Sequence, residues 1–334
     1  MRGEPTIRIV NLSIGYTAKH SMKVVSEGIT DTIRSGELTC LLGENGAGKS
    51  TLLRTLSGFL PPLSGEIAIL DKPLRVYRER ELATVIGVVL TERTNLQNMT
   101  VAELVGMGRS PYTGFWGRLS EEDRAKVDAS LEMVGISALQ DRMVQTLSDG
   151  ERQKVMIAKA LAQETPIIFL DEPTAFLDYP SKVEILHLLH RLSREMNKTV
   201  FLSTHDLELA LQIADQLWLM ARGQGVAVGT PEDLALNGTL DGFFRRKGVA
   251  FEKQTGLYRI EPEYRSEVRL SGDPVACEML RKAFRRNGIR ADFDLDAPTE
   301  VHADVSPAGV TSYTLHGSAS PRTVMSIADL LELF

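Results

Sequence analysis

An apolar run that ends in a glycine-rich loop and continues as a helical pattern restricts the fold of this sequence more than any other feature. Residues 38–42 are Leu-Thr-Cys-Leu-Leu, residues 43–51 are Gly-Glu-Asn-Gly-Ala-Gly-Lys-Ser-Thr, and residues 52–56 continue in helical register. In this order the loop is typical of a phosphate-binding loop, because glycines let backbone N–H groups surround an anion and the following helix presents its positive end. We therefore expect a sheet whose strand ends face a bound nucleotide.

The loop supplies most of the candidate nucleotide-binding residues. Lys49 is expected to bring a mobile positive charge to the β and γ phosphates, and Ser50 to hold Mg²⁺ through its hydroxyl. The other candidates in the loop are Gly43, Asn45, Gly46, Ala47, Gly48 and Thr51. The cofactors implied are ATP and Mg²⁺. A glycine-rich turn that matches by chance is the alternative, and the order of strand, loop and helix argues against it.

Two further apolar runs end in side chains suited to phosphate chemistry. Residues 167–170 lead into Asp171 and Glu172, and residues 199–202 lead into Ser-Thr-His-Asp, which includes His205. Adjacent residues on a strand point to opposite sides, so we expect Asp171 to face the metal through water and Glu172 to face the attacking water as a general base. His205 is a candidate sensor of the γ-phosphate. The alternatives are acids that cap the next helix and a histidine with a merely structural role.

The alternation of β-rich runs and helical patterns over residues 1–229 predicts an α/β domain with a largely buried sheet. The strands expected there are 38–42, 85–90, 167–170 and 200–202, and the helices are 121–133, 151–163 and 181–196. Near residue 247 the pattern changes to that of a small α+β domain. Its expected elements are strands at 266–270 and 312–315 and helices at 274–287 and 321–333. We therefore predict two domains, residues 1–246 and 247–334.

Composition excludes several classes of protein. With 334 residues and a net charge of -6, the chain lacks the basic stripe that phosphate-backbone binding needs, so no nucleic-acid partner is expected. No segment approaches the roughly 20 apolar residues that span a bilayer. The first ten residues lack the apolar block of an export signal, which favours a location inside the cell. The two cysteines, Cys40 and Cys277, fall in different predicted domains and are not expected to form a disulfide.

Residues 147–153, Leu-Ser-Asp-Gly-Glu-Arg-Gln, precede the acidic strand and predict a capping box between Ser148 and Glu151. At this distance from the phosphate-binding loop they resemble the signature motif of ABC ATPases, with Asp149 in place of the usual first glycine. The resemblance implies a P-loop NTPase domain with a RecA-like core sheet, an antiparallel β subdomain and a helical subdomain. It also implies a homodimer in which Ser148 and Gly150 bind the ATP held by the other copy.

Three further positions follow from the same resemblance. Tyr16 corresponds to the aromatic residue that stacks on adenine, and Asp178 lies in the loop that links the two ATP sites across the dimer. The family usually has a glutamine after the strand at 85–90, where this chain has Thr91. Thr91 is a candidate metal contact through water, and its effect on coupling to a membrane partner is left open.

Residues 99–105 and 108–112 resemble the importer ATPases that serve iron-siderophore, haem and cobalamin permeases. The resemblance implies transmembrane permease subunits as partners and, indirectly, a periplasmic or surface substrate-binding protein. It places the chain peripherally on the cytoplasmic face of the inner membrane. Three alternatives stay open: a non-transport ABC ATPase, for example in cofactor assembly, a transporter of another cargo, and a ligand-sensing role for residues 247–334.

Overall fold

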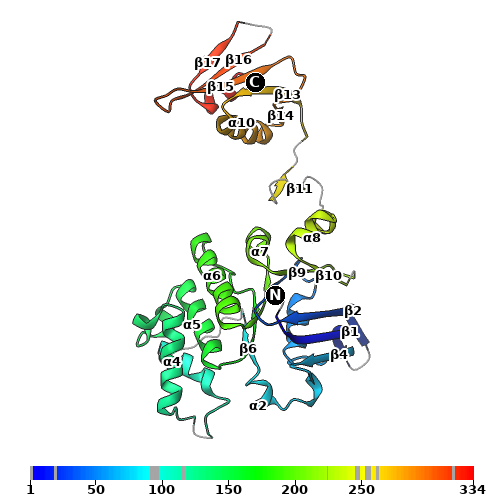
Figure 1. Cartoon of the computed structure of the whole chain (residues 1–334), viewed down its shortest axis with the longest axis vertical. Helices are drawn as coiled ribbons and strands as arrows, with labels where there is room; N and C mark the ends of the chain where they lie inside the picture. Colours follow the sequence, from blue (N-terminus) through cyan, green and yellow to red (C-terminus); the bar gives the residue numbers. More distant parts are fainter. Residues whose placement is uncertain are drawn as a thin grey trace. The chain divides into compact units, whose positions relative to one another are not determined.

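The computed structural model describes residues 3–18, 21–90, 98–114, 117–223, 225–244, 249–252, 257–260, 263–317 and 320–334. The chain divides into two compact units, Met1–Phe243 and Phe244–Phe334, each with its own core (Figure 1). Sequence patterns had placed the boundary after residue 246. Among the described residues, no helix combines the length and apolar character that crossing a bilayer requires.

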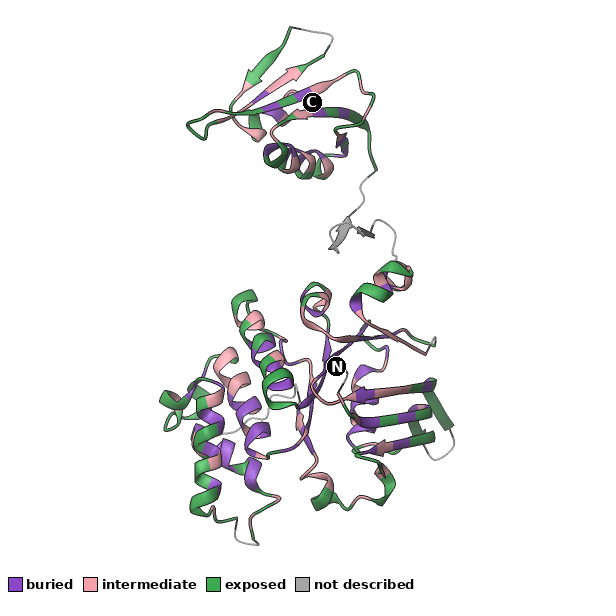
Figure 2. Ribbon diagram, in the orientation of Figure 1, coloured by how far each residue is buried: buried purple, intermediate pink, exposed green. Residues whose placement is uncertain are grey.

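The first unit is built on a six-stranded sheet with the order β10-β9-β3-β8-β7-β6. Its strands are β3 (Leu38–Gly43), β6 (Ile86–Val89), β7 (Ile167–Asp171), β8 (Thr199–Thr204), β9 (Gln216–Met220) and β10 (Val226–Gly229). All neighbouring pairs are parallel except β10 with β9. Every residue of β3 and β8 is buried, as a parallel sheet covered on both faces requires (Figure 2). The four strands predicted from sequence are confirmed.

A second, antiparallel sheet has the order β2-β1-β4-β5 and supplies the β subdomain. Its strands are β1 (Pro5–Ala18), β2 (Ser21–Arg34), β4 (Ser64–Ile69) and β5 (Lys72–Pro73). The buried face of β1 carries Ile7, Ile9, Leu12 and Ile14, which join residues of β3 and α1 (Lys49–Leu56) in one hydrophobic cluster. This shared core holds the antiparallel sheet beside the phosphate-binding loop.

Helices cover the central sheet and form a separate bundle beside it (Figure 1). Besides α1 they are α2 (Glu79–Leu82), α3 (Val101–Gly106), α4 (Glu121–Met133), α5 (Asp149–Ala162), α6 (Tyr179–Met196), α7 (Leu207–Ile213), α8 (Pro231–Leu236) and α9 (Thr239–Phe244). Short 3-10 helices are η1 (Leu74–Val76), η2 (Met107–Arg109), η3 (Ser137–Leu139) and η4 (Val144–Thr146). Helices α3, α4 and α5 pack together as the helical subdomain. The three long helices predicted from sequence are confirmed, and α5 and α6 begin earlier because Ser148 and Asp178 cap them.

The second unit contains the hairpin of β11 (Val249–Glu252) and β12 (Leu257–Ile260) and a five-stranded sheet with the order β14-β13-β15-β16-β17. The sheet strands are β13 (Ser266–Gly272), β14 (Ile289–Asp292), β15 (Glu300–Val305), β16 (Thr311–His316) and β17 (Arg322–Val324), and the helices are α10 (Pro274–Arg286) and α11 (Ile327–Leu331). The apolar side of α10 packs on this sheet. An α+β unit was predicted, but without β14 and β15.

The prediction of one final helix over residues 321–333 is wrong. Residues 322–324 form β17, in which Val324 pairs with Tyr313 of β16, and the helix begins only at Ile327. Thr323 and Val324 are β-branched and suit an edge strand, while the Ser326 side chain accepts from the Asp329 N–H and caps α11. The available sheet edge therefore decides the conformation of this segment.

Candidate functional site

The phosphate-binding loop connects β3 to α1 and is shaped by close backbone contacts. Gly48 has φ +111°, and a Cβ there would lie 2.2 Å from Val25 Cγ1 of β2. Glycine therefore suits this position, because any other residue would be strained by the left-handed backbone and would displace the Val25 side chain. Gly43, Asn45, Gly46 and Ala47 complete the loop at the carboxyl edge of the parallel sheet. The loop leads directly into the first turn of α1, and backbone N–H groups at a helix N-terminus favour a phosphate.

Lys49 is held inside this loop rather than in solvent. Its side chain is buried, and its Nζ donates to the carbonyl oxygens of Gly43 at 2.8 Å and Glu44 at 3.3 Å. Burial lowers the pKa of Lys49, and the nearby carboxylates of Glu172 and Asp171 oppose that shift. The ammonium group is thus poised at the loop with carbonyl partners that an anionic ligand can replace.

Asp171 ends β7 and faces the start of α1. Its Oδ1 accepts hydrogen bonds from Ser50 Oγ at 3.3 Å and from Ser203 Oγ at 2.6 Å. A hydroxyl and a carboxylate at this spacing are hard oxygen ligands, the kind that Mg²⁺ prefers together with phosphate oxygens. No cluster of three or more His, Cys, Asp or Glu side chains suited to a metal occurs in the part of the chain that the structure describes. The Ser50 hydroxyl and the Asp171 carboxylate are oxygen donors of the kind that fits Mg²⁺.

Glu172 lies one residue beyond β7 in the left-handed conformation, with φ +49°. Its N–H donates to Ser203 Oγ at 3.0 Å and to Ser203 O at 3.2 Å, and these bonds hold the strained backbone. The sequence argument for opposite orientations of the two acids assumed that both lie on a strand. That assumption is wrong for Glu172, because a turn anchored on β8 sets its direction.

His205 follows β8 and stands between the acid and the lysine. Its Nε2 lies 2.5 Å from Glu172 Oε1 and 3.4 Å from Lys49 Nζ. The side chain of Asp206 caps α7 and accepts a hydrogen bond from Lys182 Nζ at 3.0 Å, which fixes the chain just after the histidine. The structure thus brings Lys49, Glu172 and His205 together at the carboxyl edge of the parallel sheet.

Tyr16 of β1 also reaches the loop. Its hydroxyl lies 2.9 Å from Thr51 Oγ1 on α1, while the tyrosine as a whole is 46% exposed. An exposed ring fixed beside a phosphate-binding loop is available for stacking on a planar base.

The signature residues form a second group, which lies at the N-termini of α5 and α6. Ser148 caps α5, and its Oγ and N–H both contact Glu151 Oε2, which confirms the predicted capping box. A Cβ on Gly150 would lie 3.4 Å from Ser181 Oγ of α6, and Asp178 caps that helix through the N–H of Ser181. Helix N-termini of α5 and α6 therefore lie together, with Ser148, Gly150 and Asp178 around them.

One predicted site residue lies outside the structure's described part, and one residue of the site was not predicted. Thr91 falls in residues 91–97, outside the described part of the chain. Ser203 is a residue that the motif search missed, although it directly precedes Thr-His-Asp at the end of β8. What could have indicated Ser203 is its position at a strand end, since β7 and β8 are parallel neighbours and Asp171 pairs with Ser203.

Comparison with known proteins identifies this arrangement. A family model described as ABC transporter matches residues 26–175. An uncharacterised ABC transporter ATP-binding protein of Methanocaldococcus jannaschii is 40% identical over 255 residues, covering 76% of this chain and 87% of that protein. The ferric enterobactin transport ATP-binding protein of Escherichia coli is 38% identical over 234 residues, covering 70% and 83%. The iron(3+)-hydroxamate import ATP-binding protein of Bacillus subtilis is 35% identical over 219 residues, covering 66% and 80%.

Solved structures agree with these relatives. A component of an ABC transporter complex from Clostridium perfringens has a TM-score of 0.61 at 30% identity, covering 71% of this chain and 96% of that one. An ATP-binding cassette solved as a dimer in a post-hydrolysis state with ADP and Pi has a TM-score of 0.57 at 27% identity, covering 65% and 97%. The chain therefore belongs to the ATP-binding proteins of ABC transporters and is an ATP hydrolase of this family.

Proposed function

We propose that this protein energises the import of iron-siderophore complexes or chemically related metal chelates through a separate membrane permease. The observation that carries the proposal is the identity of 35% to 38% to ATP-binding proteins named for ferric enterobactin transport, iron(3+)-hydroxamate import and petrobactin import. The proposal is supported by the contacts that join Ser50 to Asp171 and His205 to Glu172 beside the phosphate-binding loop.

The roles of the site residues follow from their contacts. The loop N–H groups and Lys49 bind the phosphates. Ser50, and Asp171 through water, would hold Mg²⁺, which would neutralise charge on the phosphate oxygens. Glu172 accepts a proton from the attacking water, and His205 orients that carboxylate and faces the γ-phosphate. Tyr16 stacks on the adenine.

The signature group acts on a second copy of the chain. Ser148 and Gly150 lie at the N-terminus of α5, where backbone N–H groups and the helix dipole favour an anion. We propose that they meet the γ-phosphate bound by the loop of the partner and that Asp178 lies at the junction of the two sites. Loss of the γ-phosphate then releases the two copies, which converts hydrolysis into opening of the dimer.

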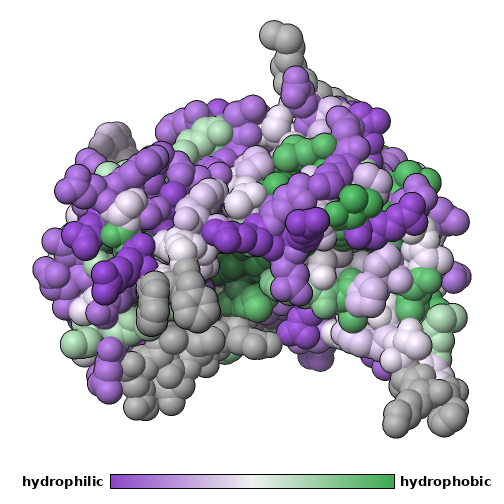
Figure 3. Space-filling model, turned by 90° about the horizontal axis from the view of Figure 1, so that it is seen from below, coloured by the Kyte–Doolittle hydropathy of each residue, from purple (hydrophilic) through white to green (hydrophobic). Residues whose placement is uncertain are grey.

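A permease partner needs a surface on the first unit, and an apolar cavity supports this part of the proposal. The cavity has a volume of about 400 Å³ and is lined by residues that follow α1 and by β4, η1 and α2, among them Leu60, Pro61, Ile67, Leu74 and Leu82. Figure 3 shows a mostly hydrophilic face with several separate hydrophobic patches, one of them in a shaded hollow near the centre of the view. Apolar hollows with a polar rim are typical of interaction sites.

We propose that the permease holds the protein at the cytoplasmic face of the membrane and that a substrate-binding protein acts through the permease.

Two substitutions test the ATPase mechanism. Glu172→Gln should retain ATP binding, abolish nearly all hydrolysis and accumulate an ATP-bound dimer, measured by light scattering and phosphate release. Lys49→Ala should instead weaken nucleotide binding itself, measured by titration with a fluorescent ATP analogue. Full turnover by the glutamine variant would contradict the assignment of Glu172 as the base.

Co-purification tests the transport role. The protein, produced with the proteins encoded beside it, should retain a membrane permease after detergent extraction, and uptake of a radioactive iron-siderophore complex should require an intact Lys49. A chain that retains only cytosolic partners would instead support a non-transport ABC ATPase.

The second unit is proposed to regulate the motor by sensing a ligand. Because it has its own core, it can be removed by ending the chain after residue 243. The truncated protein should hydrolyse ATP but respond differently to transported substrate in the assembled transporter. Equal basal and substrate-stimulated rates with and without the unit would reject a regulatory role.

A further inference from the structure

We propose that Arg109 is a positioning residue for ATP hydrolysis, because it clamps the end of α5 opposite to the signature and so sets where Ser148 meets the partner's nucleotide. This inference rests on the proposed function, in which the signature completes the site of a second copy. Residues 108–112 belong to the segment that resembles the importer ATPases. In the structure Gly108 and Arg109 are buried, and Arg109 is only 4% exposed.

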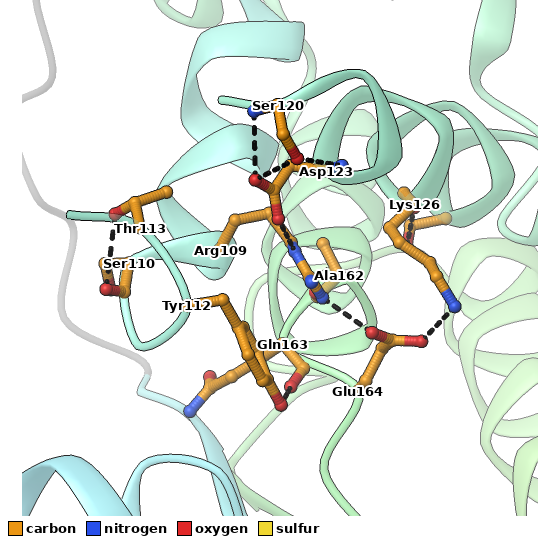
Figure 4. A network of polar contacts seen from close by, with 11 residues as sticks. Arg109, Ser110, Tyr112, Thr113, Ser120, Asp123, Lys126, Ala162, Gln163 and Glu164 are labelled. Atoms are coloured by element: carbon orange, nitrogen blue, oxygen red, sulfur yellow. Dashed lines mark hydrogen bonds and ion pairs between the residues drawn. The ribbon is translucent and has the colours of Figure 1, made fainter. Parts of the chain in front are cut away.

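Arg109 lies in η2 and joins three parts of the helical subdomain (Figure 4). Its Nε donates to Asp123 Oδ1 at 2.8 Å in the first turn of α4. Its Nη1 donates to the carbonyl oxygen of Ala162, the last residue of α5, and to Glu164 Oε2 just after it, both at 2.8 Å. One rigid guanidinium thus ties the end of α5 to the start of α4. We call Arg109 with its partners Asp123, Ala162 and Glu164 the clamp.

Both carboxylates around Arg109 are held ionised and in place by further partners. Asp123 Oδ2 accepts from Ser120 N at 3.0 Å and Ser120 Oγ at 2.7 Å. These bonds and the Arg109 guanidinium lower the pKa of Asp123 to about 2. Glu164 also pairs with Lys126 Nζ at 2.5 Å, and its pKa is lowered chiefly by that bond. The clamp therefore keeps its charges at any physiological pH.

Tyr112 extends the clamp to the central sheet. The guanidinium of Arg109 lies 4.1 Å from the centre of the Tyr112 ring, and the Tyr112 hydroxyl donates to Gln163 O at 3.0 Å (Figure 4). The side-chain Nε2 of Gln163 in turn donates to Ala83 O at 2.6 Å and to Ile86 O at 3.1 Å, at the start of β6. The end of α5 is consequently fixed both to its own subdomain and to a core strand.

The geometry of α5 explains why its far end matters for catalysis. The helix has 14 residues, so at about 1.5 Å per residue it places the clamp about 20 Å from the signature. A tilt of about 5° at the clamped end would move the signature by about 2 Å over that length. Displacements of about 1 Å are enough to lower catalysis about 100-fold. No clamp contact described above involves the phosphate-binding loop, so nucleotide binding by one copy should not depend on it.

A contribution to stability alone does not explain why an arginine is buried between Asp123 and Glu164. A buried arginine between two acids is seldom more stabilising than packed apolar side chains of the same volume, because the desolvation of the charges offsets their attraction. The directional fork of the guanidinium does fix the relative angle of the helices that it joins. This distinction between orientation and stability is what the experiment must resolve.

The test compares Arg109→Met, Arg109→Lys and Tyr112→Phe in full-length protein that also carries Glu172→Gln. Two quantities are measured, the affinity of dilute protein for a fluorescent ATP analogue and the ATP-induced dimerisation constant from light scattering. Arg124→Met removes an exposed positive charge of the same helix α4 that takes no part in the contacts described above, and it is the matched charge control. Val127→Ala, a buried substitution in α4 outside the network, is the control for general destabilisation.

We expect single-copy nucleotide affinity to stay within twofold for all variants. The dimerisation constant should weaken at least tenfold for Arg109→Met, at least threefold for Tyr112→Phe and not at all for the two controls. Arg109→Lys should remain weak, because an ammonium group cannot reach the three acceptors in the geometry of the guanidinium.

Three outcomes would overturn the proposal. They are a folded Arg109→Met protein that dimerises like its parent, a Val127→Ala control that is impaired equally, and restoration by lysine. If Arg109→Met does not fold, Tyr112→Phe decides in the same way. A parent protein that binds ATP without dimerising would refute the proposed function itself, and a parent that dimerises beside unaffected variants would refute only the role of Arg109.

Discussion

Replacing Ser203 by alanine removes one oxygen atom that touches both acids of the site. Ser203 lies at the end of β8 and is fully buried. Its hydroxyl donates to Asp171 Oδ1 at 2.6 Å and accepts from the Glu172 N–H at 3.0 Å. The variant should therefore loosen the proposed metal ligand and the proposed base at once, without removing either carboxylate.

The magnitude follows from the two bonds. A hydrogen bond to an ionised group contributes about 1.5 to 3 kcal/mol. The bond from the Glu172 N–H is partly replaced by the Ser203 carbonyl at 3.2 Å, so its loss should add little. If the bond to Asp171 is needed in the transition state, kcat should fall about 10- to 150-fold, because each 1.36 kcal/mol corresponds to a factor of ten.

The assay is phosphate release at saturating Mg-ATP and at protein concentrations that support dimerisation. Ser193→Ala is the matched control, since Ser193 is also fully buried but its hydroxyl donates to His190 O within α6, away from the site. Its kcat should stay within twofold of the unmodified protein. A Ser203→Ala protein with the same kcat as this control would refute the argument that Ser203 aligns the acids.

Three further predictions concern stability and reactivity. Gly108→Ala should lower the free energy of unfolding of the first unit by about 1 to 3 kcal/mol in urea, because its Cβ would lie 2.2 Å from a carbonyl oxygen of α5, whereas Gly114→Ala, with open space around it, should have little effect. Asp123→Asn should lower the unfolding temperature above pH 4, and this deficit should shrink as the pH falls toward 2. The reason is that a carboxylate whose pKa is lowered on folding stabilises the fold at pH values above its ordinary pKa of 3.8 and loses that effect as it is protonated. A deficit independent of pH would contradict the role of the Asp123 charge. Cys40 and Cys277 are free and buried, and burial raises the pKa of both thiols. Neither should therefore react with a thiol reagent until denaturant unfolds its unit. Rapid labelling of the native protein would contradict this prediction.

Local patterns in the sequence predicted the parts of the fold that depend on neighbouring residues. The strand, loop and helix around Lys49 are contiguous, and so are the acidic strand end and the capping box at Ser148. Apolar runs with polar ends were sufficient to place the parallel strands, because such strands are buried on both faces. The final helix was mispredicted for the opposite reason, since the pairing of residues 322–324 with β16 overrides their local preference.

The contacts that no local pattern predicted join residues far apart in the chain. Ser203 and Asp171 are 32 positions apart, and Arg109 lies 53 positions from Ala162. The left-handed backbone of Glu172 depends on β8, a strand that follows it in the sequence. Predicting such contacts requires the register of the sheet and the packing of the helices.

The sequence by itself determined that this chain has a phosphate-binding loop, acids at a strand end and a signature helix, because each arises from the spacing of a few consecutive residues. The tertiary structure alone decided how Glu172 is turned, that Ser203 contacts both acids and that Arg109 is buried as a clamp. The physical reason is that hydrogen bonds and ion pairs act only over a few ångströms, so residues distant in sequence can use them only after the hydrophobic core has brought their strands and helices together.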